Sequence, residues 1–315
     1  MADIPYKGAY RTVRYLRAEA DRSLRDRQLR GRRVPAQTGS LTCDVWVNEG
    51  ADDKVCPLVV EIHGGGFALG DARKTDKLRD WIARTFDTHV VGVDYRLAPE
   101  YAAPAQRDDV VNAVRAACLG ELGIEVDPTH VYLMGYSAGA SLALSAAIEL
   151  TRGAGIIPAG CILHYPYVDA SESIPCDGDA IGLSAEMAHA FNVWYAGDRN
   201  PGDPLVSVLA SDGDDLRRLP TCHVYPVVGD PLLPQAEALA ARLAAADVDC
   251  RWVPVAGAYH GYLEDAADMA AYRAQTMDET LSSRPKGFLG VAKDVLRESL
   301  QRVLGPATRD IEINF

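Results

Sequence analysis

Residues 130–147 read His-Val-Tyr-Leu-Met-Gly-Tyr-Ser-Ala-Gly-Ala-Ser-Leu-Ala-Leu-Ser-Ala-Ala, and this stretch decides how we interpret the whole chain. A short apolar run precedes Gly135, and a run rich in alanine and leucine follows Gly139. The pattern predicts a strand, a sharp turn and a helix, with Ser137 at the turn. Such a turn exposes a nucleophile at the amino-terminal end of a helix, where developing negative charge is stabilised. The alternative is a glycine-bounded turn with an idle serine, so the rest of the chain has to supply the partners.

Outside this stretch, short β-branched runs alternate with longer helical patterns. We expect strands at 41–47, 57–62, 89–94, 130–134, 160–165, 221–228 and 251–255, and helices near 73–86, 104–119, 138–151, 235–246, 264–282 and 289–304. Two of the strands, 57–62 and 89–94, are almost continuously apolar, which is typical of strands buried on both faces. The alternation predicts a mostly parallel sheet with helices on both faces, and ligands of such sheets bind at the carboxyl ends of the strands.

A glycine-rich loop at residues 63–66, His-Gly-Gly-Gly, directly follows the 57–62 strand. Three glycines after a buried strand cost conformational entropy, so we expect a function that requires them. We expect the backbone N–H groups of Gly64 and Gly65, together with that of Ala138, to bind the oxyanion of an acyl-transfer reaction. A phosphate-binding loop is the alternative, but no Gly-Lys-Ser/Thr follows and no G-x-G-x-x-G is completed.

A nucleophilic serine needs a base. His260 follows the last expected strand, in the loop Gly-Ala-Tyr-His-Gly-Tyr, so it reaches the same edge of the sheet as Ser137. The chain has six other histidines. His63 belongs to the glycine loop, and His189 lies in an irregular insert. The remaining four lie in or beside apolar strands, where we expect core histidines with satisfied hydrogen bonds; they are His89, His130, His164 and His223.

The base in turn needs a carboxylate that orients it. Asp230 follows the 221–228 strand after a single glycine, again at a carboxyl end. Asp247 and Asp249 are weaker candidates, because they precede a strand and face the other edge. The resulting order along the chain, Ser137, Asp230, His260, is the order expected of an α/β-hydrolase.

Several further motifs make the chain resemble the hormone-sensitive-lipase-like carboxylesterases of the α/β-hydrolase superfamily. Residues 94–100 read Asp-Tyr-Arg-Leu-Ala-Pro-Glu, and the motifs around Asp230 and His260 match the acid and base motifs of that family. Shorter matches stand at Pro104-Ala105, Asp108-Asp109 and Asp127-Pro128. The resemblance covers about residues 40–265. It implies an α/β-hydrolase fold with a small helical lid, built as a single domain over 1–315, and a triad that needs no cofactor and no metal.

Two segments interrupt the alternation, and the resemblance implies that both belong to the lid over an acyl pocket. They are residues 1–40 and 171–219, the second with an apolar stripe at helical spacing that contains Leu183, Met187, Phe191 and Trp194. Phe67, Phe191 and Trp194 are candidate pocket-lining residues. The alternative for the stripe is plain packing of the lid against the core.

The chain departs from the pattern of the resembled family at the residue before the nucleophile. The family usually has aspartate there, whereas this chain has Tyr136. With Phe67 and the aromatic insert, Tyr136 is expected to narrow the pocket, which favours short acyl groups such as acetyl to hexanoyl. Asp94 and Arg96 are expected to brace their loop by a buried ion pair rather than to touch substrate.

Charge is unevenly distributed along the sequence. The chain has 315 residues, a net charge of −12 and an apolar share of 48%, which argues against disorder and against general affinity for nucleic acid. Residues 1–33 carry ten basic and four acidic side chains, a surplus of six positive charges. We expect this segment to be a helix with Tyr6, Val13, Leu16 and Leu24 packed inward and its arginines solvated or paired with the acidic body. An arm that binds an anionic surface or a partner is the alternative.

The seven cysteines are widely spaced and include no C-x-x-C pair. We therefore expect small buried side chains in a reducing compartment rather than a disulfide framework or a zinc site. The sequence shows no signal-peptide pattern and no apolar run of about 18 residues. These features predict a cytoplasmic protein without membrane insertion, and the resemblance leaves a homodimer open.

These observations together predict a serine carboxylesterase that hydrolyses short-chain, acetyl-type esters through an acyl-serine intermediate. Its partner is a small-molecule ester. An amidase or deacetylase would use the same triad. The rival of another class is a non-catalytic small-molecule receptor, but a receptor that had lost catalysis would be expected to lack the histidine that this chain has at 260.

Overall fold

A central sheet of eight strands organises the computed structural model, which describes residues 4–38, 41–50, 55–153, 155–172, 185–268 and 287–313. In chain order the strands are β1 (Arg32–Thr38), β2 (Leu41–Asn48), β3 (Cys56–Ile62), β4 (His89–Asp94), β5 (Val126–Tyr136), β6 (Gly160–His164), β7 (Thr221–Tyr225) and β8 (Cys250–Trp252). Their spatial order is β1-β2-β4-β3-β5-β6-β7-β8, antiparallel between β1, β2 and β4 and parallel from β4 onward. The mostly parallel sheet that the alternation predicts is confirmed.

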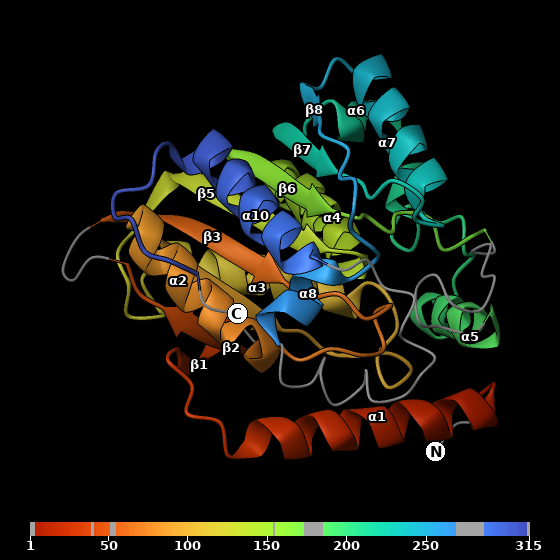
Figure 1. The fold of residues 1–315 in the computed structure, drawn as a ribbon. Coiled ribbons are helices and arrows are strands. Elements are labelled where there is room, and N and C mark those ends of the chain that lie inside the picture. Colours follow the sequence, from red (N-terminus) through yellow and green to blue (C-terminus); the bar gives the residue numbers. More distant parts are fainter. Residues whose placement is uncertain are drawn as a thin grey trace.

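Helices cover both faces of the sheet (Figure 1). One face is covered by α3 (Ala105–Cys118), α4 (Ala138–Gly153) and α7 (Leu233–Ala245), and the other by α2 (Asp76–Phe86), α8 (Tyr262–Ala267) and α10 (Phe288–Leu304). Each layer has its own apolar core, because strands buried on both faces point alternate side chains to opposite sides. On β3, for example, Leu58, Val60 and Ile62 lie in one core and Val59 in the other. The short elements are η1 (Ala72–Thr75), η2 (Val208–Ala210) and α6 (Gly213–Leu216).

Two further helices lie outside the two layers. Figure 1 shows α1 (Lys7–Arg25) as a long helix along one side of the body and α5 (Ala185–Ala196) near its amino-terminal end. They share a small apolar cluster in which Val13 of α1 meets Phe191 and Trp194 of α5. The indole N–H of Trp194 donates to the carbonyl oxygen of Pro5 over 2.9 Å.

The structure differs from the sequence-based expectation at the amino-terminal segment. The helix ends at Arg25 and β1 begins at Arg32, so residues 32 and 33 are strand and not helix. β1 is an edge strand with the sequence Arg-Arg-Val-Pro-Ala-Gln-Thr, whose few apolar residues and proline conceal the alternation of a strand. Leu16 is another correction, because its side chain does not pack inward and is 39% exposed.

Element boundaries shift elsewhere by a few residues. β5 starts earlier than expected, at Val126, and β7 and β8 are shorter than expected, although Val227 and Val255 still form a bridge. The helix expected at 264–282 begins at Tyr262, and α8 ends at Ala267. Residues 269–282 of that expectation lie outside the described residues, as does Leu183 of the apolar stripe.

The basic amino-terminal segment pairs with acidic groups on the body. Arg17 bonds the carboxylate of Glu100, and Arg27 bonds Asp268 at 2.8 Å. Further pairs of this kind join Arg30 to Asp80, Arg32 to Glu49 and Arg33 to Asp44, whereas the acidic Asp21 of the segment pairs with Arg73 of the body. The positive surplus of residues 1–33 therefore has counter-charges on the folded chain.

The cysteines are free thiols in the part of the chain that the structure describes. Cys43, Cys56, Cys161 and Cys222 are buried, whereas Cys176 lies outside the described residues. Within the described ranges, no helix combines the length and the apolar composition that a membrane span requires. The cytoplasmic location and the homodimer stay predictions.

A buried ion pair joins β3 to α2. The Arg79 guanidinium of α2 contacts the Glu61 carboxylate of β3 over 2.9 Å, and their side chains are 0% and 1% exposed. Hydrogen bonds from Thr75 to Glu61 and from Arg79 to Asn48 satisfy further polar atoms. Such a pair is costly to break from one side, because the remaining charge stays buried without compensation.

Replacing Glu61 by alanine is therefore expected to lower the free energy of unfolding by about 3–5 kcal/mol. Urea denaturation, monitored by circular dichroism, measures the free energy of unfolding. The matched control is Glu298→Ala, which removes an exposed pair with Arg302 and should cost less than about 1 kcal/mol. Equal losses in the two variants would contradict the assignment of Glu61 as a buried counter-charge.

Candidate active site

Ser137 lies at the junction of β5 and α4, and its backbone is in the left-handed region with φ of 51°. A left-handed serine is strained, and the surrounding structure has to hold it there. Its N–H donates to the carbonyl oxygen of His164 at 3.0 Å, and its own carbonyl accepts the N–H of Ala140. The sharp turn that the sequence predicts between strand and helix is present.

The two glycines of the turn are needed for close packing. A Cβ at position 139 would lie 2.1 Å from the carbonyl oxygen of Ile62, and one at position 135 would lie 2.3 Å from the carbonyl oxygen of Gly139. The first turn of α4 therefore lies directly against the end of β3. This contact brings Ser137 next to the 63–66 loop, which continues from β3.

His260 and Asp230 complete a continuous chain of hydrogen bonds with Ser137. Nε2 of His260 lies 2.9 Å from Oγ of Ser137, and Nδ1 of His260 lies 2.7 Å from Oδ2 of Asp230. The carboxylate can only accept, so Nδ1–H donates to Asp230 and Nε2 accepts the serine proton. The three side chains come from the ends of β5 and β7 and from the loop before α8, and the structure brings them together as the sequence predicts.

The charge of Asp230 favours the protonated form of His260. Burial lowers the pKa of His260, but the negative charge of Asp230 and its hydrogen bond raise it, with smaller contributions from Glu264 and Asp265, and the net shift is upward. Asp230 is itself held in place, because its Oδ1 accepts the N–H of Leu232 at 2.8 Å. The site therefore stabilises an imidazolium between the serine and the aspartate.

The loop of residues 63–66, the expected oxyanion loop, differs from expectation at Gly64. The N–H of Gly64 donates to Oε1 of Glu264 at 2.9 Å, so it is not available to an oxyanion in this arrangement. The expectation that Gly64 is an oxyanion donor is wrong for this reason. Ala138 is the first residue of α4, where backbone N–H groups have no acceptor within the helix, and Gly65 follows Gly64 in the loop.

The sequence analysis missed Glu264 as a residue of the site. An acidic residue one turn after a histidine at the start of a helix looks like any surface carboxylate. Its proximity to the loop of Gly64 arises from contacts between residues 200 positions apart. No sequence signal that we used could have found it.

Two of the four candidate lining residues, Phe191 and Trp194, lie on α5, which meets the oxyanion loop. The ring of Phe191 stands 2.3 Å from where a Cβ of Gly66 would be, so α5 packs directly on this loop. Trp194 lies in the same cluster as Val13 of α1. Met187 packs against this cluster, which agrees with lid packing as a role for the stripe.

The other two candidate lining residues, Phe67 and Tyr136, are buried in aromatic clusters. Phe67 is 1% exposed and stacks on Tyr195 with ring centroids 3.6 Å apart. Tyr136 is fully buried in the core on the α8 and α10 side, where its ring stacks against His164 and Tyr165. Tyr136 therefore fills core space, which does not support a role in lining the pocket.

The ion pair expected between Asp94 and Arg96 does not form. Arg96 instead donates to both carboxylate oxygens of Asp109 at 2.9–3.0 Å, and its backbone N–H also bonds Asp109. Burial and the nearby charge of Asp71 raise the pKa of Asp94 to about 6. The interaction that holds the loop after β4 therefore joins Arg96 to Asp109 of α3. The sequence did not indicate this pairing, because the two residues lie in different elements.

The other histidines take varied positions. His164 is buried, and burial lowers its pKa to about 3. Neither of its ring nitrogens has a hydrogen-bond partner among the described residues, so it is not the satisfied core histidine that we expected. His130 is also a correction, because it is exposed and pairs with Asp127. His63 is buried with Nδ1 2.8 Å from the carbonyl oxygen of Gly64.

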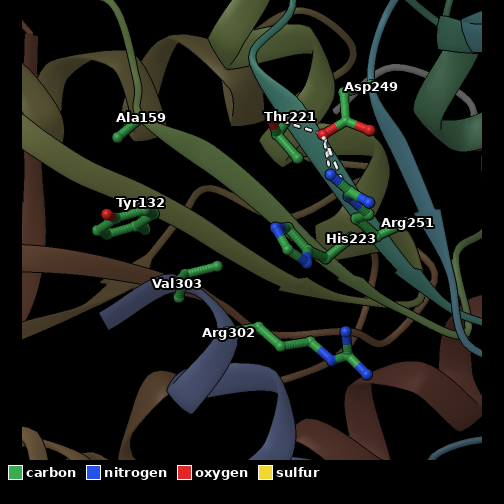
Figure 2. A pocket seen from close by; sticks show the side chains of 8 residues that line it. All are labelled: Tyr132, Ala159, Thr221, His223, Asp249, Arg251, Arg302 and Val303. Atoms are coloured by element: carbon green, nitrogen blue, oxygen red, sulfur yellow. Dashed lines mark hydrogen bonds and ion pairs between the residues drawn. The ribbon is translucent and has the colours of Figure 1, made fainter. Parts of the chain in front are cut away.

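Two cavities lie away from the triad. One of about 730 Å³ lies between α1 and the loops that follow β3 and β4, with Leu16, Leu69, Asp94 and Tyr95 in its walls. The other, of about 420 Å³, is shown in Figure 2, where His223 lies between Arg251 and Arg302. No member of the triad lines either cavity. Within the described residues, no group of three or more His, Cys, Asp or Glu side chains is placed to hold a metal.

A nucleophile on a strained strand-to-helix turn, served by a histidine and an aspartate from later strand ends, defines a serine hydrolase of the α/β type. A family model described as "alpha/beta hydrolase fold" (Abhydrolase_3) matches residues 59–264. The chain belongs to this family. The resemblance to hormone-sensitive-lipase-like carboxylesterases is confirmed by this match and by the curated relatives.

Two bacterial relatives of this chain are esterases. The carboxylesterase NlhH of Mycobacterium tuberculosis is 34% identical over 218 residues, which cover 67% of either chain. The esterase LipI of the same organism is 30% identical over 221 residues, 69% of either chain. The structure of a thermostable esterase from Pseudomonas putida matches with a TM-score of 0.76 and 21% identity, covering 95% of this chain and 91% of that one. At that identity the likeness shows the fold alone.

The electrostatic role assigned to Asp230 can be tested on His260 directly. Replacing Asp230 by asparagine removes the charge that favours the imidazolium, so the pKa of His260 is expected to fall from its raised value. Titration of the imidazole signals by nuclear magnetic resonance measures the shift. The matched control is Asp249→Asn, the competing acid of the sequence analysis, which pairs with Arg251 and should leave the His260 titration unchanged. A titration that is insensitive to Asp230 would exclude it as the orienting acid.

Proposed function

We propose that this protein is a serine carboxylesterase that hydrolyses short-chain acyl esters through an acyl-serine intermediate on Ser137. The observation that carries the proposal is the hydrogen-bond chain from Asp230 through His260 to Ser137 at the strand-to-helix turn. The chain is a carboxylic ester hydrolase, because it belongs to the family above and its relatives NlhH and LipI are esterases. What we propose beyond this is the acyl-serine intermediate on Ser137 and the preference for short acyl chains.

In the first half of the reaction, Nε2 of His260 takes the proton of Ser137 while Oγ attacks the ester carbonyl carbon. The negative charge that develops on the carbonyl oxygen is held by the N–H groups of Gly65 and Ala138. Loss of one such donor typically costs about 10²–10³ in rate. Asp230 keeps His260 in the tautomer that accepts this proton, and stabilises the imidazolium that results.

The tetrahedral intermediate collapses when the imidazolium of His260 gives its proton to the leaving alkoxide. The alcohol departs, and the acyl group stays on Ser137. In the second half, His260 takes a proton from water, and the hydroxide attacks the acyl-serine carbonyl at the same oxyanion site. Ser137 then recovers its proton from His260, and the carboxylic acid leaves.

The lid in this proposal consists of α1 and α5. Arg17 of α1 donates to the carbonyl oxygens of Ala68 and Ala98, which belong to the loops after β3 and β4. Phe191 of α5 packs on Gly66. These contacts hold both helices against the loops that follow β3 and β4, and they support the proposal that α1 and α5 cover the acyl pocket.

The acyl preference is tested with p-nitrophenyl esters of rising chain length. We expect the highest kcat/KM between acetyl and hexanoyl, with a steady decrease for longer chains, because the lid limits the space beside Ser137. Release of p-nitrophenolate measures the rate.

Ser137→Ala is the control for the acyl-serine route. It should lower kcat on the order of 10⁶-fold while the circular dichroism spectrum stays unchanged. Ser137-independent turnover would contradict the proposal, and a higher rate on a matched p-nitroanilide than on the ester would favour the amidase alternative.

The lid role of α1 is tested by deleting residues 1–25, which ends before β1. We expect kcat/KM to fall at least about tenfold, because misplacement of groups around a site is costly in rate. A finer comparison uses single changes on the helix. Arg17→Ala removes the bonds to Ala68, Ala98 and Glu100 and should reproduce part of the loss. Arg22→Ala removes a pair with Glu19 and a bond to the Ala18 carbonyl oxygen, both within α1, and should not. Unchanged kinetics on deletion would instead favour a binding arm.

A further inference from the structure

Glu264 connects two parts of the site that are distant in sequence. It lies in the first turn of α8, four residues after His260, and its Oε1 accepts the N–H of Gly64 at 2.9 Å. The segment that carries the catalytic base is thereby bonded to the first glycine of the oxyanion loop. The proposed mechanism assigns no role to this carboxylate.

The loop and the carboxylate fit closely against each other. A Cβ at position 64 would lie 2.7 Å from Oε2 of Glu264 and 3.0 Å from the backbone oxygen of Tyr136. The carboxylate therefore occupies the space next to the glycine, and a side chain at this position would displace it. The backbone of Gly64 is fixed from one side by Glu264 and from the other by the end of β5.

The surroundings of Glu264 allow it to change charge near neutral pH. The pKa of Glu264 is raised to about 7, because burial and, to a smaller extent, Asp265 outweigh the lowering effects of the Gly64 N–H, Lys74 of η1 and His260. The buried phenols of Tyr95, Tyr136 and Tyr165 also lie near its charge. A carboxyl group accepts a hydrogen bond in either protonation state. The bond to Gly64 can therefore persist across the neutral pH range.

We propose that Glu264 is a positioning residue for the oxyanion loop: by holding the N–H of Gly64, it fixes the loop backbone so that the next N–H, that of Gly65, faces the carbonyl attacked by Ser137. This inference rests on the proposed function. Because Glu264 and His260 share one short segment, the same bond ties the loop to the base. The carboxylate also adds a second negative charge near the imidazolium, after that of Asp230.

Three substitutions separate the hydrogen bond from the charge. Glu264→Gln keeps the length and an accepting oxygen but removes the charge, whereas Glu264→Asp keeps the charge but is too short to reach Gly64. Glu264→Ala removes both. We expect kcat on p-nitrophenyl acetate to stay within about threefold for Gln and to fall about 10-fold to 10²-fold for Asp and Ala, with little change in KM.

The pH profile gives a readout that a merely structural residue would not move. The charge of Glu264 favours the protonated form of His260, so its loss in Glu264→Gln lets His260 lose its proton at lower pH. The acid limb of kcat/KM should therefore move to lower pH in this variant. The matched control is Asp249→Asn, whose carboxylate pairs with Arg251 away from the triad. Both kcat and the acid limb should stay near wild type in this control.

Amide hydrogen exchange at Gly64 tests the bond independently of turnover. Protection of this N–H should persist in wild type and Glu264→Gln and be lost in Glu264→Asp and Glu264→Ala. Wild-type kcat and protection in the Asp variant would overturn the inference, as would a Gln variant as slow as Ala. If the wild type shows no Ser137-dependent hydrolysis, the proposed function fails, and the exchange pattern still decides whether Glu264 holds the loop. Should the Ala variant not fold, the Asp and Gln pair decides the question.

Discussion

The contact between the first turn of α4 and the end of β3 is the constraint on which the rest of the site depends. Two glycines make it possible, since a side chain at position 139 would overlap the carbonyl oxygen of Ile62. The same contact forces Ser137 into its left-handed backbone conformation and aligns it with the loop that leaves β3. Nucleophile and oxyanion loop are thus positioned by one packing interaction, and their mutual distance does not depend on flexible side chains.

Charges around this contact are arranged at two depths. Beneath it, Glu61 and Arg79 form a pair that is shielded from water and contributes to how β3 and α2 fit together. Within the site itself, Asp230 and Glu264 place negative charge near His260. The site therefore favours the imidazolium that appears during the reaction, while each carboxylate also holds a backbone N–H, of Leu232 and of Gly64. Electrostatics and backbone positioning are combined in the same groups.

The overall fold and the triad could be predicted from the sequence because their signals are local. Buried parallel strands are continuous apolar runs, and the turn around Ser137 needs glycines at fixed offsets. The edge strand β1 could not be predicted in this way, since its one exposed edge and its proline leave a polar, irregular pattern. The position of Tyr136 was equally hidden, because a tyrosine beside a nucleophile can point to the pocket or to the core.

The sequence by itself determined that Ser137, Asp230 and His260 meet at the carboxyl edge of the sheet, because strand ends and turn glycines are recognised from consecutive residues. The tertiary structure alone decided the partners of these residues. That Arg96 bonds Asp109 and not Asp94, and that the N–H of Gly64 belongs to Glu264 and not to an oxyanion, follows from how separate helices pack on the sheet. Hydrogen bonds and ion pairs between distant segments depend on the distance between two groups and on their relative orientation. A linear pattern of residue types contains neither the distance nor the orientation.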